Sequence, residues 1–269
     1  MLTTMLGFWY LQVFTCISIL YLSLLVGLSA FFIAAGGYVV NDYFDFEIDK
    51  VNRPDRVLPK GLLSLRTAYL YSFVLFIIGF ILVLFTKNIY CFMLALFNAI
   101  SLFLYAKFFK KALFIGNIIV SWNACSTFLF GAILSSNLTN MMPLIYFSFL
   151  YTMIREWVKL IEDYEGDLQE RVRSIATLYG KRITLYLIMA ISAILIVSVD
   201  VFSYQDFYVS EFRLILRVII SIPLFIYLMI LTKYLLKNDI VSKIQKCMKL
   251  SMLSIVIVFI FNDVINIRL

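Results

Sequence analysis

Aspartates gather at helical spacing in the segment that follows a long apolar stretch near the start of the chain. Asp42, Asp45 and Asp49 are separated by three and four residues, which places their side chains on one face of a helix. Three like charges on one face repel each other, and the C-terminal end of a helix disfavours anions further. A divalent cation would offset this repulsion, because magnesium binds oxygen ligands and combines carboxylates with phosphate oxygens. The segment therefore predicts a Mg²⁺ site at these three aspartates, with Asn41 on its rim.

A second acidic segment follows later in the chain. Asp163 and Asp167 are i, i+4 neighbours and share a helix face, and Glu156, Glu162 and Glu165 add carboxylates around them. Charges this close to an apolar block are costly and indicate a functional cavity. Two carboxylate clusters can hold one diphosphate between them through bridging Mg²⁺, which neutralises the charge of a leaving group. We therefore expect the two segments to meet at one site for Mg²⁺ and a diphosphate.

Basic residues near both segments are candidates for binding phosphate. A guanidinium group can bind two phosphate oxygens at once, and an ammonium group acts as a compact charge. Taken singly, each is equally well explained as a positive charge that anchors a helix end at the membrane surface. The candidates are Arg53, Arg56, Lys107, Arg155, Lys159, Arg173 and Lys181.

Membrane helices are the elements that must position these residues. The chain is 63% hydrophobic and 14% charged, whereas soluble domains are about 45–50% apolar. The apolar residues form blocks long enough to cross a bilayer as helices, without the alternation of a transmembrane barrel. The sequence predicts an all-α polytopic membrane protein with eight or nine transmembrane helices. The expected spans are 3–17, 19–41, 64–86, 90–106, 112–135, 142–160, 182–202, 212–233 and 248–266.

The distribution of charge predicts the orientation. Of 23 lysines and arginines, 19 fall in the polar segments that these spans place on one side, at 41–66, 107–111, 155–182 and 233–249. Such a bias marks the cytoplasmic side. It puts the acidic segments in the cytoplasm and explains the net charge of +7 without a nucleic-acid partner.

The chain has no histidine and no closely spaced cysteines, which excludes histidine catalysis and argues against zinc or redox sites.

The whole chain, residues 1–269, is expected to form a single transmembrane domain. Four predicted spans separate the two acidic segments. This spacing suggests two halves, at about residues 1–135 and 136–269, each carrying one Asp-rich motif.

The acidic segments resemble the signatures of a known family. Asn41-Asp42-x-x-Asp45-x-x-x-Asp49, followed by Arg53-Pro54, is similar to the first signature of the UbiA superfamily of intramembrane prenyltransferases, and Asp163-x-x-x-Asp167 to the second. Tyr105-Ala106-Lys107 and Gly116-Asn117 extend the resemblance through the middle of the chain.

The resemblance implies a fold and a reaction. It implies nine transmembrane helices around a central cavity, with a cytoplasmic cap, in a multi-pass protein of the cell membrane. It implies Mg²⁺ as cofactor and transfer of a polyprenyl group from its diphosphate to a lipid or aromatic acceptor. The implied catalytic and metal residues are Asp42, Asp45, Asp49, Asp163 and Asp167, and Tyr105, Lys107 and Asn117 join the substrate-binding candidates.

The resemblance leaves open which acceptor is prenylated and whether the chain is an active enzyme. Both acidic segments are most similar to the branch that prenylates the hydroxyl of geranylgeranylglyceryl phosphate and makes an ether lipid. An aromatic ring of quinone, haem or chlorophyll-type biosynthesis is the alternative acceptor. A non-enzymatic transporter is the second alternative, although a transporter usually has its charged site near the middle of the membrane. An inactive homologue is the third alternative, because residues 170–176 (Glu-Arg-Val-Arg-Ser-Ile-Ala) depart from the usual family pattern.

Overall fold

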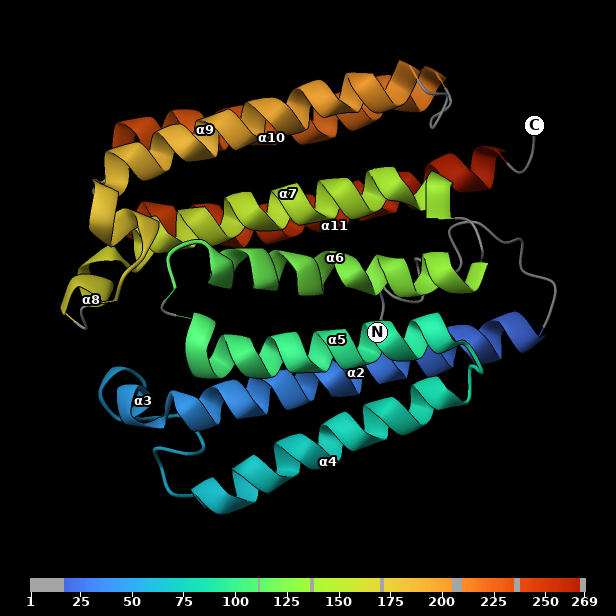
Figure 1. Ribbon diagram of the computed structural model, residues 1–269. Coiled ribbons are helices and arrows are strands. Elements are labelled where there is room, and N and C mark those ends of the chain that lie inside the picture. Colours follow the sequence, from blue (N-terminus) through green and yellow to red (C-terminus); the bar gives the residue numbers. More distant parts are fainter. Residues whose placement is uncertain are drawn as a thin grey trace. The chain divides into compact units, whose positions relative to one another are not determined.

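The protein is helical throughout its described part, as Figure 1 shows. The computed structural model describes residues 17–110, 112–135, 138–169, 172–204, 210–234 and 238–266, and no strand occurs among them. The long helices are α2 (Ile17–Phe44), α4 (Leu65–Leu84), α5 (Ile89–Leu104), α6 (Ile115–Ser135), α7 (Leu138–Glu162), α9 (Ile175–Tyr204), α10 (Ser210–Tyr234) and α11 (Asn238–Asn266). The short helices are α3 (Phe46–Asn52), α8 (Tyr164–Gln169) and the π-helix η1 (Tyr105–Phe109). The predicted all-α fold class is confirmed.

Several helices have the length and hydropathy of membrane spans, so the chain is a multi-pass membrane protein. Within the described ranges, six segments qualify: Leu20–Phe44, Leu65–Leu84, Ile89–Phe109, Ile115–Ser135, Ile175–Phe202 and Leu214–Tyr234. The predicted spans 142–160 and 248–266 fall within α7 and α11, which are not among these six. The predicted span 3–17 lies outside the described residues except for residue 17. The total of eight or nine spans therefore stays a prediction.

The chain packs as two compact units, each of which is described by itself. The first unit takes its residues from Met1–Lys110 and Ser126–Leu138, and the second from Lys111–Cys125 and Thr139–Leu269. The first acidic segment belongs to the first unit and the second segment to the second unit. The prediction of one domain with halves at 1–135 and 136–269 stays a prediction.

Small residues allow close helix packing in the first unit, where α2 packs against α4 and α5 (Figure 1). The Ser29 hydroxyl on α2 donates a hydrogen bond of 2.8 Å to the carbonyl of Gly79 on α4. A β-carbon at Gly79 would lie 2.7 Å from Cγ1 of Ile33 and 3.1 Å from the carbonyl oxygen of Ser29. Small residues at such contacts are typical of membrane helices, because they let two backbones approach. This contact fixes α2, the helix that ends in the first acidic segment.

We expect Gly79→Ala to destabilise the first unit by about 1–3 kcal/mol, the usual cost of overpacking a tight contact. Thermal unfolding in detergent measures the effect as a lower midpoint. Gly166→Ala is the matched control, because a β-carbon there meets nothing within 4 Å. Equal unfolding midpoints for the two variants would contradict the packing argument.

Side-chain caps fix where α4 and α5 begin. The Ser64 hydroxyl accepts a hydrogen bond of 3.1 Å from the Thr67 amide, and the Asn88 side chain accepts one of 2.9 Å from the Tyr90 amide. Both satisfy amides that lack a partner within their own helix. The cap at Ser64 ends the polar loop that follows α3, and this loop carries Arg56.

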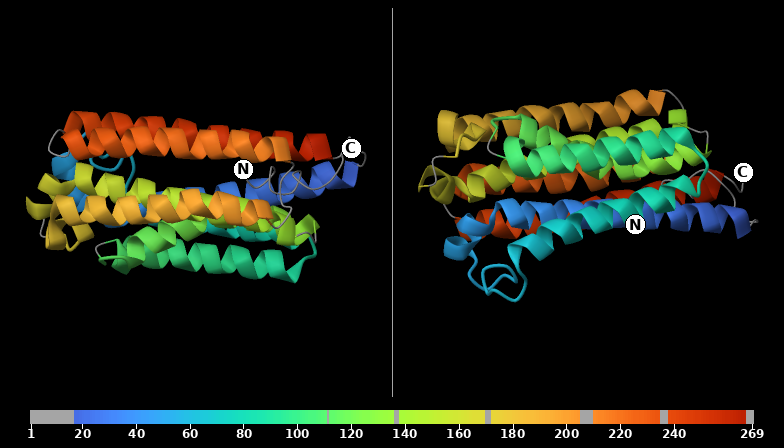
Figure 2. Two further views of the ribbon diagram at one scale, coloured as in Figure 1. Left: turned by 90° about the horizontal axis from the view of Figure 1, so that it is seen from above. Right: turned by 60° about the horizontal axis from the view of Figure 1, so that its bottom comes forward.

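The second unit is built around α10, which packs against both α9 and α11 (Figure 2). The hydroxyls of Tyr227 on α10 and Ser251 on α11 lie 2.8 Å apart in a hydrogen bond. The Gln245 side chain on α11 donates a hydrogen bond of 2.7 Å to the carbonyl of Arg155 on α7. These contacts hold the end of α7, from which the second acidic segment continues.

Candidate active site

The first acidic segment lies at the end of α2 and continues into α3. A turn at Asp45 separates the two helices, yet the helical register is kept across it. The Asp45 amide donates to the Asn41 carbonyl at 2.9 Å, and the Asp49 amide donates to the Asp45 carbonyl at 2.8 Å. This register keeps Asp42, Asp45 and Asp49 on the same side of the chain, as their spacing predicts.

Arg56 bridges two of these carboxylates. Its Nη1 atom lies 2.9 Å from Oδ1 of Asp42 and 2.6 Å from Oδ2 of Asp49. The Asp49 side chain is buried and that of Asp42 is half exposed. One guanidinium thus neutralises both ends of the acidic face, which brings the loop after α3 back over the end of α2.

Lys110 neutralises the remaining carboxylate. Its ammonium pairs with Oδ2 of Asp45, and the Asn41 amide nitrogen donates to the same oxygen at 2.7 Å. The Asp45 side chain is only 8% exposed, so a partner of opposite charge is required there. Sequence reasoning missed Lys110 and selected Lys107 from the same basic stretch.

The π-helix η1 explains why Lys110 reaches Asp45. The Lys110 amide donates to the Tyr105 carbonyl at 2.9 Å, five residues back, so one residue is added relative to an α-helical turn. Lys107 is exposed, with its ammonium 4.9 Å from the centre of the Phe108 ring. Tyr105 is half-buried at the start of the π-helix. Single π-turns inside helices occur frequently at functional sites.

The donor set at this end of α2 suits a hard divalent cation. Asp42, Asp45 and Asp49 offer carboxylate oxygens, the ligand type that Mg²⁺ prefers. In the described ranges, no three acidic or cysteine side chains stand close enough to form a metal site by themselves. Arg56 and Lys110 supply the positive charge instead. The residues therefore fit Mg²⁺ in chemistry, provided that these two cations give up their carboxylates.

The second acidic segment lies where α7 ends. Asp163 occupies the bend between α7 and α8, and the Asp167 amide donates to the Asp163 carbonyl at 2.9 Å. This bond preserves the predicted i, i+4 relation of the two aspartates. Asp163 is exposed and Asp167 is half-buried. Because the two acidic segments belong to different units, their convergence on one site stays a prediction.

Lys181 is the buried cation of the second unit's acidic end. Its side chain is 7% exposed, and its ammonium lies 3.3 Å from Oε1 of Glu165 and 4.8 Å from the centre of the Tyr164 ring. α9 is broken at Gly180, whose φ of 88° is in the region that favours glycine. The break directly precedes Lys181, so it separates the first turn of α9 from the long part of the helix that begins with Lys181.

The other predicted phosphate ligands differ in the exposure of their side chains and in their contacts. Arg155 is half-buried, its Nη2 atom lies 2.6 Å from Oε1 of Glu156, and its Nε atom is buried without a partner. Asn117 is half-buried in the first turn of α6. The side chains of Arg53, Lys159 and Arg173 are exposed. Arg155 and Lys181 are thus the least exposed of the predicted basic phosphate ligands in the second unit.

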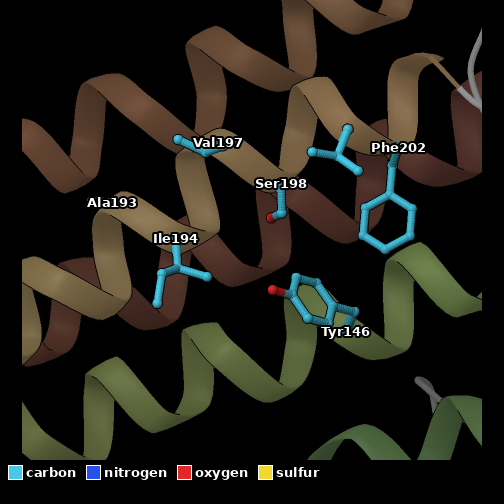
Figure 3. A pocket seen from close by; sticks show the side chains of 7 residues that line it. Tyr146, Ala193, Ile194, Val197, Ser198 and Phe202 are labelled. Atoms are coloured by element: carbon cyan, nitrogen blue, oxygen red, sulfur yellow. The ribbon is translucent and has the colours of Figure 1, made fainter.

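An apolar pocket of about 540 Å³ lies between α7 and α9 in the second unit, as Figure 3 shows. Two of its lining residues, Tyr146 on α7 and Phe202 on α9, pack edge to face with ring centres 5.5 Å apart. No charged side chain lines the pocket, so it cannot bind a diphosphate. It is suited to hydrocarbon, and along α7 it lies about 25 Å from Asp163, at 1.5 Å per residue.

Comparison with known proteins identifies the family. The model of the UbiA prenyltransferase family matches residues 1–255. The chain is 38% identical to a digeranylgeranylglyceryl phosphate synthase of Saccharolobus solfataricus over 261 residues, covering 95% of this chain and 87% of the relative. It is 39% identical to the protein of the same name from Methanocaldococcus jannaschii, covering 90% and 84%.

Solved structures share the fold. A structure described as digeranylgeranylglyceryl phosphate synthase in membranes matches with a TM-score of 0.81 and 34% identity, over 97% of this chain and 92% of that one. A UbiA homologue from Archaeoglobus fulgidus, bound to GPP and Mg²⁺, matches with a TM-score of 0.73 at 18% identity, over 96% and 94%. The family model covers nearly the full length of the chain, and the helices match this fold. The chain therefore belongs to the UbiA prenyltransferase family.

Proposed function

We propose that this prenyltransferase moves a geranylgeranyl group from its diphosphate to the hydroxyl of geranylgeranylglyceryl phosphate, forming an ether lipid. The observation that carries the acceptor is the identity of 38% and 39% to two digeranylgeranylglyceryl phosphate synthases over most of both chains. The charged groups at the two acidic segments supply the chemistry that such a transfer requires.

The carboxylates of both segments are proposed to hold Mg²⁺ together with the diphosphate. Asp42, Asp45 and Asp49 would do so from the first unit, and Asp163 and Asp167 from the second. When bound, Mg²⁺ neutralises the charge that grows on a diphosphate leaving group. Binding of GPP and Mg²⁺ by the Archaeoglobus fulgidus homologue supports the choice of cofactor.

The basic residues are proposed to share the phosphate groups of the two substrates. Arg56 and Lys110 already lie among the first carboxylates, so they are placed to bind the oxygens of the diphosphate. Arg155 and Lys181 belong to the second unit and are proposed to bind the phosphate of the acceptor. Asn41, held 2.7 Å from Asp45, orients that carboxylate.

The reaction is a substitution at the allylic carbon of the donor. The bond between that carbon and the diphosphate oxygen breaks, and its electron pair leaves with the diphosphate. The acceptor oxygen forms the new carbon–oxygen bond, and its hydroxyl proton is taken up by the departing diphosphate. The apolar helices exclude water from the cationic carbon, which limits hydrolysis of the donor.

The acidic ends of α2 and α7 are proposed to face the cytoplasm. The support is the bias of 19 among 23 basic residues toward one side of the predicted topology. Mg²⁺ would then reach the site from the cytoplasm, where the polar headgroups of both substrates would lie, while their apolar chains stay in the bilayer.

The acceptor can be tested by direct comparison. We expect the purified protein in nanodiscs, with Mg²⁺ and geranylgeranyl diphosphate, to prenylate geranylgeranylglyceryl phosphate at least about a hundredfold faster than 4-hydroxybenzoate. A site that binds a polar group of its substrate rejects compounds that lack it by large factors, because its own buried charges are left unpaired. Mass spectrometry of the lipid products measures both rates.

Geranylgeranylglycerol, which lacks only the phosphate, is the matched control for this comparison. Its rate should fall between those of the other two acceptors. Faster prenylation of the aromatic acid than of the glyceryl phosphate would overturn the proposed acceptor and favour an aromatic prenyltransferase.

A further inference from the structure

Arg56 and Lys110 occupy the carboxylates that the proposed function assigns to Mg²⁺. Arg56 binds Asp42 and Asp49, and Lys110 binds Asp45. Each of the three aspartates on this face therefore already has a cation, and these cations come from two different parts of the chain. A metal ion that is to bind all three carboxylates must compete with both cations.

We propose that Arg56 and Lys110 are exchangeable counter-ions that make binding of Mg²⁺ and binding of diphosphate depend on each other. Without ligand, they neutralise the three carboxylates and compete with Mg²⁺. When diphosphate arrives together with the metal, its oxygens take over the guanidinium and the ammonium, which frees the carboxylates for Mg²⁺. This inference rests on the proposed function of the first acidic segment. It adds that the two ligands of this segment bind cooperatively.

The placement of both cations favours exchange. The Arg56 and Lys110 side chains are 34% and 36% exposed, whereas those of Asp45 and Asp49 are 8% and 9% exposed. The cations are therefore more accessible to an entering anion than Asp45 and Asp49 are, whereas Asp42 is itself 47% exposed. Arg56 belongs to a loop and Lys110 follows the π-helix η1, so neither is held inside a regular α-helix.

Coupling of the two ligands follows from this arrangement. Diphosphate binds Arg56 and Lys110, which otherwise compete with Mg²⁺ for the carboxylates. Mg²⁺ in turn binds the carboxylates, which otherwise compete with diphosphate for Arg56 and Lys110. Thermodynamic linkage requires the two effects to be equal. The metal site should thus stay weak until the substrate is present.

Equilibrium dialysis of the full chain in nanodiscs, with Mn²⁺ as the metal probe and inorganic diphosphate as the anion, tests the exchange. We expect Lys110→Met to bind Mn²⁺ alone about tenfold more tightly than the wild type, as loss of one charge-assisted competitor predicts. The same variant should lose most of the gain in Mn²⁺ affinity that diphosphate gives to the wild type. Lys60→Met is the matched control. It removes the same charge from the same unit, but Lys60 pairs with the exposed Asp55 and not with one of the three aspartates.

The outcomes separate this inference from the proposed function. Mn²⁺ affinity in Lys110→Met no higher than in Lys60→Met would overturn the exchange while leaving the metal–diphosphate site in place. Absence of bound Mn²⁺ even with diphosphate would overturn both. If Lys110→Met does not fold, Arg56→Met tests the same exchange at Asp42 and Asp49, with the same expected tightening.

Discussion

Asp45→Asn should reduce prenyl transfer by at least about a hundredfold, the size of effect expected when one preorganised charge is lost from an active site. Asp45 is one of the two buried carboxylates of the first acidic segment, and both Asn41 and Lys110 contact its Oδ2 atom. Asparagine keeps the shape but loses the charge that a metal ligand requires. The measurement is the rate of ether-lipid formation at saturating donor and Mg²⁺.

Asp55→Asn provides the control for this variant. Asp55 lies in the loop after α3, where its carboxylate is exposed and pairs with Lys60 at 3.2 Å. Its replacement removes one negative charge from the same unit without touching the three aspartates, so the rate should change by less than about twofold, in line with a surface ion pair. Unfolding midpoints that match the wild type would show that neither variant acts through stability.

Asp167→Asn should cause a comparable loss, about a hundredfold or more, because the proposed site needs charge from both units. Asp167 follows Asp163 by one helical turn, and Asp167 is the less exposed of the two. Asp239→Asn is the matched control, since Asp239 is an exposed carboxylate in the first turn of α11 in the same unit. The same rate assay reports both variants.

Combining Asp45→Asn with Asp167→Asn tests whether the two carboxylates act on one diphosphate. Residues that work as one unit are strongly non-additive, so the double variant should be little slower than the slower single variant. A loss equal to the product of the two single losses would mean that the aspartates act independently. That result would contradict the convergence of the two segments.

The helices and the first acidic face could be predicted from the sequence. Long apolar blocks allow no other secondary structure in a membrane, so the predicted spans 64–86 and 112–135 match α4 and α6 closely. The spacing of Asp42, Asp45 and Asp49 predicted a shared face, because the helical register continues from α2 into α3. Both predictions depend only on interactions between residues close in the chain.

The partners of the aspartates could not be predicted in the same way. Lys110 is 65 residues from Asp45, and its position depends on the added residue of the π-helix, which no composition or spacing signal indicated. That Arg56 binds phosphate stays a prediction, and its ion pairs with Asp42 and Asp49 were not predicted. The break of α9 at Gly180 was not predicted either, because a single glycine does not by itself predict a kink.

A structure of the full chain with Mg²⁺ and an unreactive thio-analogue of geranylgeranyl diphosphate is the most direct test of the proposed site. It should show Mg²⁺ at about 2.1 Å from carboxylate oxygens of both acidic segments, with Arg56 and Lys110 turned from the aspartates to the diphosphate. Metal ions bound by one segment alone, or a diphosphate held away from Asp45 and Asp167, would contradict it.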